Sequence, residues 1–154
     1  MGKTYQYSDE LIIKHPVDRV FEFFSRPENL AKITPPKLGF EILTPGPIPM
    51  HVGSVIDYTV RILPGVRVQW TTLIAEYEPN KRFVDVQLKG PYSLWHHQHC
   101  FEPLSESETK MIDTVTYMMP MGWVGRMSHM LFVKRDIRRI FQYRKQVLSD
   151  LLEF

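Results

Sequence analysis

The sequence contains one cysteine, Cys100, which excludes an internal disulfide and a cysteine-rich zinc site. Its apolar runs, such as Met130–Val133, are only a few residues long, so none could cross a membrane as a helix. The net charge of +2 is too small to indicate a polyanionic partner, and we expect no nucleic-acid binding. The motif G-x-G-x-x-G and the P-loop motif are also absent, which argues against nucleotide binding of those kinds.

The composition is that of an ordinary soluble protein. Hydrophobic residues make up 44% of the 154 residues and charged residues 23%, so we expect one globular domain over residues 1–154. The first ten residues hold no apolar core of the kind found in signal peptides. Together with the single cysteine, this predicts a cytoplasmic location.

The order of predicted elements places almost all strands between helices. Tyr5–Ile13 alternates like a strand, and two short helices are expected next, one beginning at Pro16 and one at Pro27–Ile33. Six more strand signals follow, and turn residues separate the last five of them. They are Phe40–Leu43, Ser54–Ile62, Val66–Tyr77, Arg82–Lys89, Ser93–Pro103 and Thr109–Met118. Short connections imply antiparallel pairing.

The final segment, Trp123–Leu152, contains no proline and repeats its apolar residues at three- and four-residue spacing. This pattern predicts one amphipathic helix about 42 Å long, whose apolar stripe must be buried against the sheet. The fold class is therefore α+β: a seven-stranded antiparallel curved sheet wrapped around a long C-terminal helix. One helix cannot fill so concave a sheet, so we expect a hollow between them.

The turns also predict which side chains share a face, because side chains alternate along a strand. The loop Leu104–Glu108 pairs His99 with Asp113 and leaves a polar, charge-matched opposite face. The turn at Gly65 pairs Tyr58 with Trp70. The turn at Gly90–Ser93 places three apolar residues of the preceding strand opposite His99, His97 and Trp95; they are Val84, Val86 and Leu88. The resulting inner face is apolar with a small polar cluster, as in small-molecule sites.

Four stretches carry a resemblance to a known family. They are IIKHPVDRVFEFFSRPENLAKITPP, GPYSLWHHQHCFEP, DTVTYMMPMG and RRIFQYRKQVL. Together they resemble the SRPBCC superfamily, the START-related, birch-pollen-allergen-like helix-grip proteins, in its polyketide cyclase/dehydrase or lipid-transport branch. The resemblance implies a deep hydrophobic cavity under the C-terminal helix, usually without a cofactor. The glycine-rich loop of the pollen-allergen branch is absent, so no phosphate-binding role is carried over.

Two histidines and an aspartate admit three interpretations. His99 and Asp113 are expected directly opposite each other, with Cβ atoms about 5 Å apart, and a carboxylate so placed can orient an imidazole as a general base. The alternative, which we favour, is a hydrogen-bonded pair that closes the cavity or orients a ligand. His97, His99 and Asp113 also have the composition of a two-histidine, one-carboxylate metal site, but no supporting groups are evident. We expect no metal and no cofactor.

The C-terminal segment raises two further questions. It carries six basic residues, and we interpret them as a solvated helix face rather than a membrane-binding one; they are Lys134, Arg135, Arg138, Arg139, Arg144 and Lys145. Transient membrane contact stays open, whereas stable insertion is not expected. Five methionines near the start of this segment serve either as core filling or as an adaptable cavity mouth; they are Met118, Met119, Met121, Met127 and Met130.

The sequence therefore predicts binding of a hydrophobic or amphipathic small molecule, such as a lipid, polyketide or quinone, in an internal cavity. The predicted binding residues are Tyr58, Trp70, Trp95, His97, His99, Phe101, Asp113, Tyr117, Met127, Met130 and Leu131. One alternative is a polyketide cyclase/dehydrase-type enzyme, with His99 and Asp113 as its acid/base pair and Tyr117 or His97 stabilising an enolate. A second alternative is an interaction module that uses the basic helix face.

Overall fold

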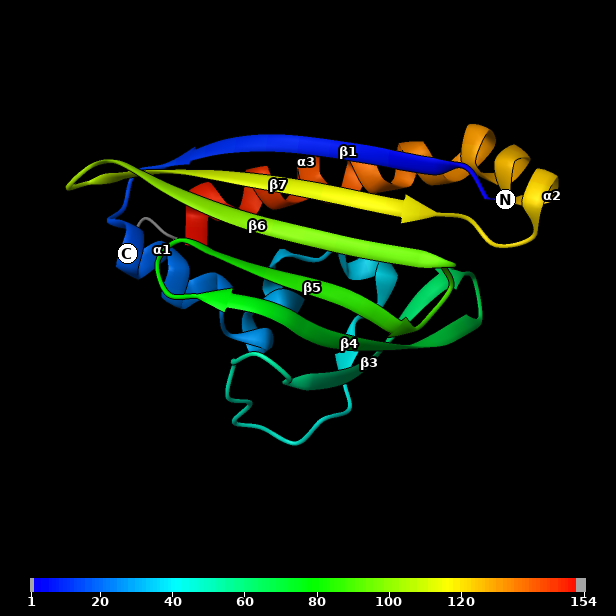
Figure 1. Cartoon of the computed structure of the whole chain (residues 1–154), viewed down its shortest axis with the longest axis horizontal. Helices are drawn as coiled ribbons and strands as arrows, with labels where there is room; N and C mark the ends of the chain where they lie inside the picture. Colours follow the sequence, from blue (N-terminus) through cyan, green and yellow to red (C-terminus); the bar gives the residue numbers. More distant parts are fainter. Residues whose placement is uncertain (1, 152–154) are drawn as a thin grey trace.

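The computed structural model describes residues 2–151. Seven strands form its sheet: β1 (Thr4–Ile13), β2 (Glu41–Ile42), β3 (Val55–Leu63), β4 (Val66–Glu78), β5 (Arg82–Lys89), β6 (Leu94–Ser105) and β7 (Glu108–Met118). Their order across the sheet is β1-β7-β6-β5-β4-β3-β2, and every neighbouring pair is antiparallel. The sheet curves along this order, with the helices gathered behind it (Figure 1).

Three short helices connect β1 to β2. They are α1 (Val17–Phe24) and the 3-10 turns η1 (Pro27–Ile33) and η2 (Pro36–Leu38). Pro27 and Pro36 each occupy an early helical position, where the missing N–H costs nothing. The two helices predicted here are confirmed, and η2 is an additional short turn.

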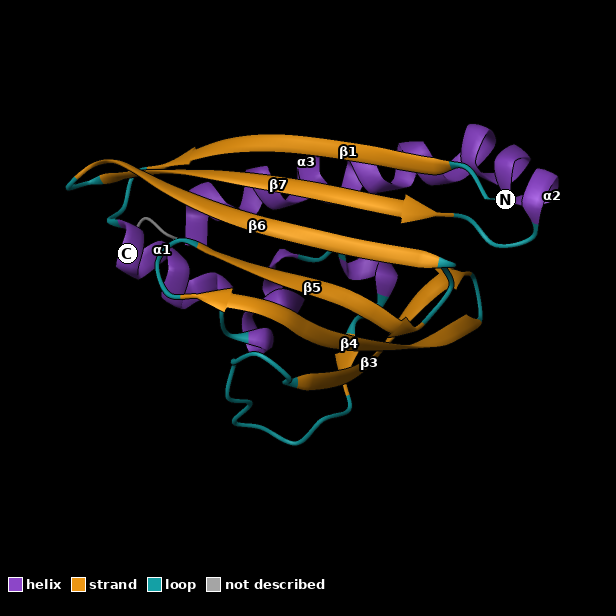
Figure 2. Ribbon diagram, in the orientation of Figure 1, coloured by secondary structure: helices purple, strands orange, loops and turns teal. Residues whose placement is uncertain are grey.

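The C-terminal segment is continuously helical but not uniform. It consists of α2 (Gly122–Ser128), the π-helical η3 (His129–Val133) and α3 (Lys134–Leu151). The backbone stays in the right-handed helical region at both junctions. The predicted long helix is therefore present, with its end at Leu152 outside the described residues. Figure 2 shows it running along the sheet with the shorter helices at its side.

The core consists of two apolar clusters on the concave face. One joins Phe21 and Phe24 of α1 to Phe83, Phe101 and Met111 of the sheet. The other joins Val115 and Tyr117 of β7 to helix residues Ile137 and Phe141. These clusters attach the helices to the sheet at different places, and the space between them is available for a cavity.

The register predictions hold for two of the three hairpins. His99 stands opposite Asp113 and Trp95 opposite Tyr117, as predicted. Tyr58 also stands opposite Trp70, although a bulge near Arg61 shifts the last pair before the turn.

The prediction for β5 and β6 is wrong by one residue. Phe83 stands opposite His99 and Asp85 opposite His97, so these two side chains join the histidines on the concave face. Val84, Val86 and Leu88 do not share that face, and Leu88 is exposed. The slip arises at the Gly90–Ser93 turn, because a change of one residue in loop length moves every side chain to the other face of the sheet.

Candidate functional site

A cavity of about 670 Å³ lies between the sheet and the helices. Its walls combine strand residues from β3 to β6 with helix residues from α1, η1, η3 and α3. The volume is within the range of cavities that bind drug-sized molecules. The interior is mostly apolar, and Asp85, His97, His99 and Arg144 form a polar cluster in its wall.

Aromatic rings form much of one wall. Trp70 lies at the centre: its ring stacks on Tyr58 with centroids 5.9 Å apart and meets Trp95 edge-on at 5.2 Å. Tyr92 contacts both tryptophans. These rings present flat apolar surfaces to a ligand, and aromatic pairs of this kind hold one another in fixed orientations.

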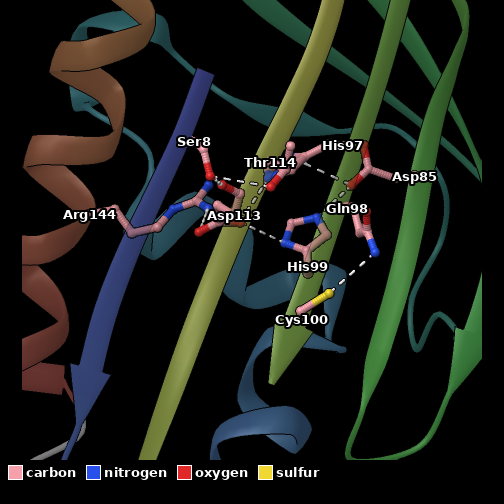
Figure 3. A network of polar contacts seen from close by, with 9 residues as sticks. All are labelled: Ser8, Asp85, His97, Gln98, His99, Cys100, Asp113, Thr114 and Arg144. Carbon is pink, nitrogen blue, oxygen red and sulfur yellow. Dashed lines mark hydrogen bonds and ion pairs between the residues drawn. The ribbon is translucent and has the colours of Figure 1, made fainter. Parts of the chain in front are cut away.

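The polar groups form a buried cluster of two histidines and two aspartates (Figure 3). Nε2 of His97 lies 2.7 Å from Oδ1 of Asp113, and Nε2 of His99 lies 2.7 Å from Oδ2 of Asp85. The remaining ring nitrogen of His99 is 3.1 Å from Asp113, and that of His97 is 3.8 Å from Asp85. Each histidine is therefore held between both carboxylates.

The two carboxylates are ionised at neutral pH. Burial by itself would raise the pKa of Asp113, but hydrogen bonds with His97 and His99 and the charge of Arg144 outweigh it and bring the pKa far below its usual range. Burial also opposes ionisation of Asp85, and the hydrogen bond with His99 together with nearby positive charge again lowers its pKa. The cluster thus carries two negative charges close to the cavity wall.

The two histidines differ in how readily they take up a proton. Burial and repulsion by His99 lower the pKa of His97, despite its hydrogen bond with Asp113. Burial opposes protonation of His99 as well, but hydrogen bonds and charge from Asp113 and Asp85 raise its pKa. His99 is therefore the preferred site for a proton, and His97 stays neutral over a wider pH range.

Arg144 of α3 completes the cluster from the helix side. Its side chain is buried, its guanidinium lies over the Phe141 ring at 4.9 Å, and Nη1 is 3.6 Å from Oδ2 of Asp113. Nε and Nη1 have no hydrogen-bond partner among the described residues, and Arg144 lines the cavity. A buried donor without a partner costs about 1–3 kcal/mol, so an acceptor oxygen placed in the cavity would be stabilising here.

The predicted binding residues fall into three groups. Tyr58, Trp70, Trp95, His97 and His99 line the cavity. Phe101, Asp113 and Tyr117 are buried but lie outside its lining. The third group is exposed and does not line it either; these residues are Met127, Met130 and Leu131.

The hydroxyl of Tyr117 bonds to a third histidine, His129, rather than to His97 or His99. The hydroxyl oxygen is 2.7 Å from Nε2 of His129, and burial raises the pKa of Tyr117 to about 12. The two residues form a second polar contact under the C-terminal helix. The geometry therefore does not bring Tyr117 to the position of an enolate-stabilising group.

Two residues of the cluster, Asp85 and Arg144, were not assigned to the site from the sequence. Asp85 was missed because of the one-residue slip in β5. Arg144 was placed with the solvated basic residues, yet it falls on the same helix stripe as Ile137, Phe141 and Leu148. The sequence holds one signal for the burial of Arg144: it occupies a position of the apolar stripe, four residues before Leu148.

Three residues of the cluster have the composition of a metal site. One ligand atom each from Asp85, His97 and His99 lies within 4.8 Å of the other two. The carboxylate in this group is Asp85, whereas the sequence pattern places Asp113 beside the two histidines. Nε2 of His99 already bonds to Asp85, so a metal ion would have to replace that hydrogen bond.

Comparison with known proteins identifies the fold. No model of a known protein family and no curated protein matches the sequence. Solved structures do match over nearly the whole chain. The Zhui aromatase/cyclase from Streptomyces sp. R1128 has a TM-score of 0.74 at 18% identity, covering 98% of this chain and 94% of that one. The chain therefore has the same helix-grip fold as these structures.

Two further structures with this helix-grip fold show the same extent of similarity. A protein from Chromobacterium violaceum matches with a TM-score of 0.72 at 16% identity, covering 97% of both chains. Norcoclaurine synthase from Thalictrum flavum, in complex with dopamine and hydroxybenzaldehyde, matches with a TM-score of 0.66 at 14% identity, covering 97% of this chain and 88% of that one. Identities this low establish the fold and leave the ligand to be argued from the site itself.

Proposed function

We propose that the protein binds an amphipathic small molecule, with its apolar body against the aromatic wall and its polar end at Arg144. The observation that carries this proposal is a mostly apolar cavity of about 670 Å³ whose wall contains buried donor groups without a partner among the described residues. Lipids, polyketides and quinones all belong to this class. The norcoclaurine synthase structure, which holds small molecules, supports the same type of occupant.

The polar end of the ligand carries an acceptor oxygen. Nε and Nη1 of Arg144 and Nε1 of Trp70 are buried donors without a partner among the described residues, and both side chains line the cavity. An arginine fork binds a carboxylate or carbonyl oxygen with well-defined geometry. The apolar walls supply most of the affinity, at about 25 cal/mol per Å² of apolar surface removed from water.

Nile red, a neutral apolar dye, tests this proposal. We expect the purified protein to bind the dye and decanoic acid to displace it. Trp95→Glu, which puts a charge on the cavity wall, should reduce dye binding at least tenfold. Leu131→Glu is the matched control, because Leu131 is exposed outside the cavity and its replacement should leave binding unchanged. Equal dye binding by the folded Trp95→Glu variant contradicts the proposal.

A second candidate function is proton transfer on a carbonyl compound. His97 lines the cavity, and its low pKa keeps it neutral, as a general base requires. His97 would take a proton from the carbon next to the carbonyl group. The electron pair of the broken C–H bond would form a C=C bond with the carbonyl carbon, the π electrons of the carbonyl group would move to its oxygen, and Arg144 would stabilise the resulting enolate. Two of the structures with the same fold are enzymes by name, an aromatase/cyclase and a synthase.

Deuterium exchange separates a carrier from an enzyme. An enolisable aromatic ketone such as tetralone is incubated in D₂O, and the loss of its α-proton signal is followed by NMR. An enzyme should accelerate this exchange, and both His97→Ala and Asp113→Asn should reduce the rate by about 10² or more. A carrier should bind the ketone without accelerating exchange.

A further inference from the structure

An exposed apolar patch covers the outer side of α2 and η3. Its members are large side chains that a soluble surface does not normally collect in one place: Met121, Trp123, Val124, Met127, Met130, Leu131 and Phe132. Met130 is 78% exposed, Trp123 67% and Phe132 60%. Scattered apolar residues need no explanation, but seven within twelve consecutive positions mark an interaction surface.

The orientation of this patch is set by two residues on the inner side of the same segment. His129 is buried, bonded to the Tyr117 hydroxyl at 2.7 Å and stacked on Tyr5 with centroids 3.5 Å apart. Gly125 packs so closely that a Cβ there would lie 2.0 Å from the carbonyl oxygen of Pro120. Because His129 packs against the sheet and Gly125 against the segment that follows β7, the methionines and aromatic residues of the patch face outward.

The charged residues within the patch and in the two positions after η3 are positive, and the first acidic residue beyond them is Asp136. Arg126 lies within the patch, and Lys134 and Arg135 follow directly after η3; all three are exposed. From Thr114 to Arg135 the sequence contains no aspartate or glutamate. A second copy of the chain would bring the same positive groups against these, whereas a negatively charged lipid surface would attract them.

We propose that α2 and η3 dock this protein on the surface of an anionic lipid bilayer. The apolar side chains would enter the boundary between headgroups and acyl chains, and the arginines and lysine would meet lipid phosphates. Trp123 has the amphipathic ring that favours this boundary. No helix among residues 2–151 is long and apolar enough to span a membrane, so the contact is at the surface.

The patch also borders the cavity. Phe132 belongs to both, since its exposed side chain is part of the cavity lining, and Ser128 and Val133 of the same segment line the cavity as well. A bilayer bound to the patch would therefore lie next to the cavity. The docking itself rests on the exposed side chains and the positive groups and does not require a ligand.

Vesicle flotation with the full chain tests the docking. We expect binding to vesicles of phosphatidylcholine with phosphatidylglycerol, at least tenfold weaker binding to phosphatidylcholine alone, and a steep loss with added salt. The double variant Trp123→Ser/Met130→Ser, outside the cavity lining, should weaken binding at least tenfold. The matched control Leu88→Ser/Leu104→Ser removes two exposed apolar side chains elsewhere and should bind like the unmodified protein.

Three results would overturn the proposal. The first is absence of binding to the anionic vesicles, and the second is equal loss of binding in the control variant. The third is a dimer in sedimentation velocity that dissociates when Trp123 and Met130 are replaced, because the patch would then be occupied by a second copy. The Nile red measurement on the same variants is independent of these outcomes, so docking and ligand binding are tested separately.

Discussion

His97 on β6 and Asp113 on β7 are joined by a 2.7 Å hydrogen bond that runs diagonally between the strands. Directly opposite His97 stands Val115, while Asp113 stands opposite His99. The diagonal bond allows one buried carboxylate to contact both histidines and Arg144. Asp113 is thus the residue that connects the strands to the helix at the polar end of the cavity.

Replacing Asp113 should be costly for stability. Asp113→Asn preserves the shape but leaves the buried Arg144 without its closest negative charge, so we expect the free energy of unfolding to fall by about 3–5 kcal/mol. Urea denaturation measures this loss. Asp9→Asn is the control, because Asp9 pairs with Lys145 in a partly exposed ion pair and its loss should cost no more than about 1 kcal/mol. If both variants lose the same free energy of unfolding, the buried cluster stabilises the protein no more than the ion pair between Asp9 and Lys145 does.

Acidification should destabilise the protein through the same carboxylates. The pKa values of Asp113 and Asp85 are lower in the folded chain than the unfolded value of about 3.9. Their stabilisation is therefore complete above that value and is lost as the pH falls through the folded pKa values. Urea unfolding at a series of pH values between about 5 and 2 should show a steep decline, and the decline should be shallower for Asp113→Asn.

The two histidines should titrate on opposite sides of the usual value of about 6.5. The pKa of His99 is raised, so its contribution to stability is present below about 6.5 and disappears as the pH rises through the folded pKa. The pKa of His97 is lowered, so protonation of His97 at low pH reduces stability, and this loss disappears as the pH rises above about 6.5. NMR titration of the ring protons, assigned with single histidine variants, measures both. A higher pKa for His97 than for His99 would contradict the described network.

Arg144 should decide which ligands are preferred. Replacing Arg144 with glutamine removes the charged fork, so the preference for decanoic acid over decanol in Nile red displacement should fall at least tenfold. Lys145→Gln is the neighbouring control and should keep the preference, since Lys145 contacts Asp9 instead. An unchanged preference in the Arg144→Gln variant would remove Arg144 from the proposed site.

Gly125→Ala should destabilise the start of the C-terminal helix. Alanine in place of glycine ordinarily stabilises a helix by about 0.5–1 kcal/mol. Here the added Cβ would lie 2.0 Å from a backbone oxygen, so we expect the opposite sign and a loss of more than about 1 kcal/mol. Thermal unfolding monitored by circular dichroism gives the sign. Arg126→Ala, at an exposed neighbouring position, should change stability little.

The sequence alone determined the order of elements and much of the sheet. Alternating side chains and turn residues predict the pairing of His99 with Asp113 and of Tyr58 with Trp70, and both pairs are present. Such patterns are local, because a short turn fixes which residues of two adjoining strands can meet. The apolar spacing after Trp123 predicts a long helix for the same local reason.

Tertiary structure decided the composition of the site and the exposed patch. The register of β5 depends on one residue of loop length, which turned Asp85 inward and Leu88 outward. The π-helical turn at His129–Val133 interrupts the regular helical spacing, so His129 faces the sheet while Met127, Met130 and Leu131 face outward. Arg144 is buried because Asp113 meets it from β7, a contact between residues far apart in the sequence. Local patterns carry no information about such contacts, since the stabilising partner exists only after the helix has packed on the sheet.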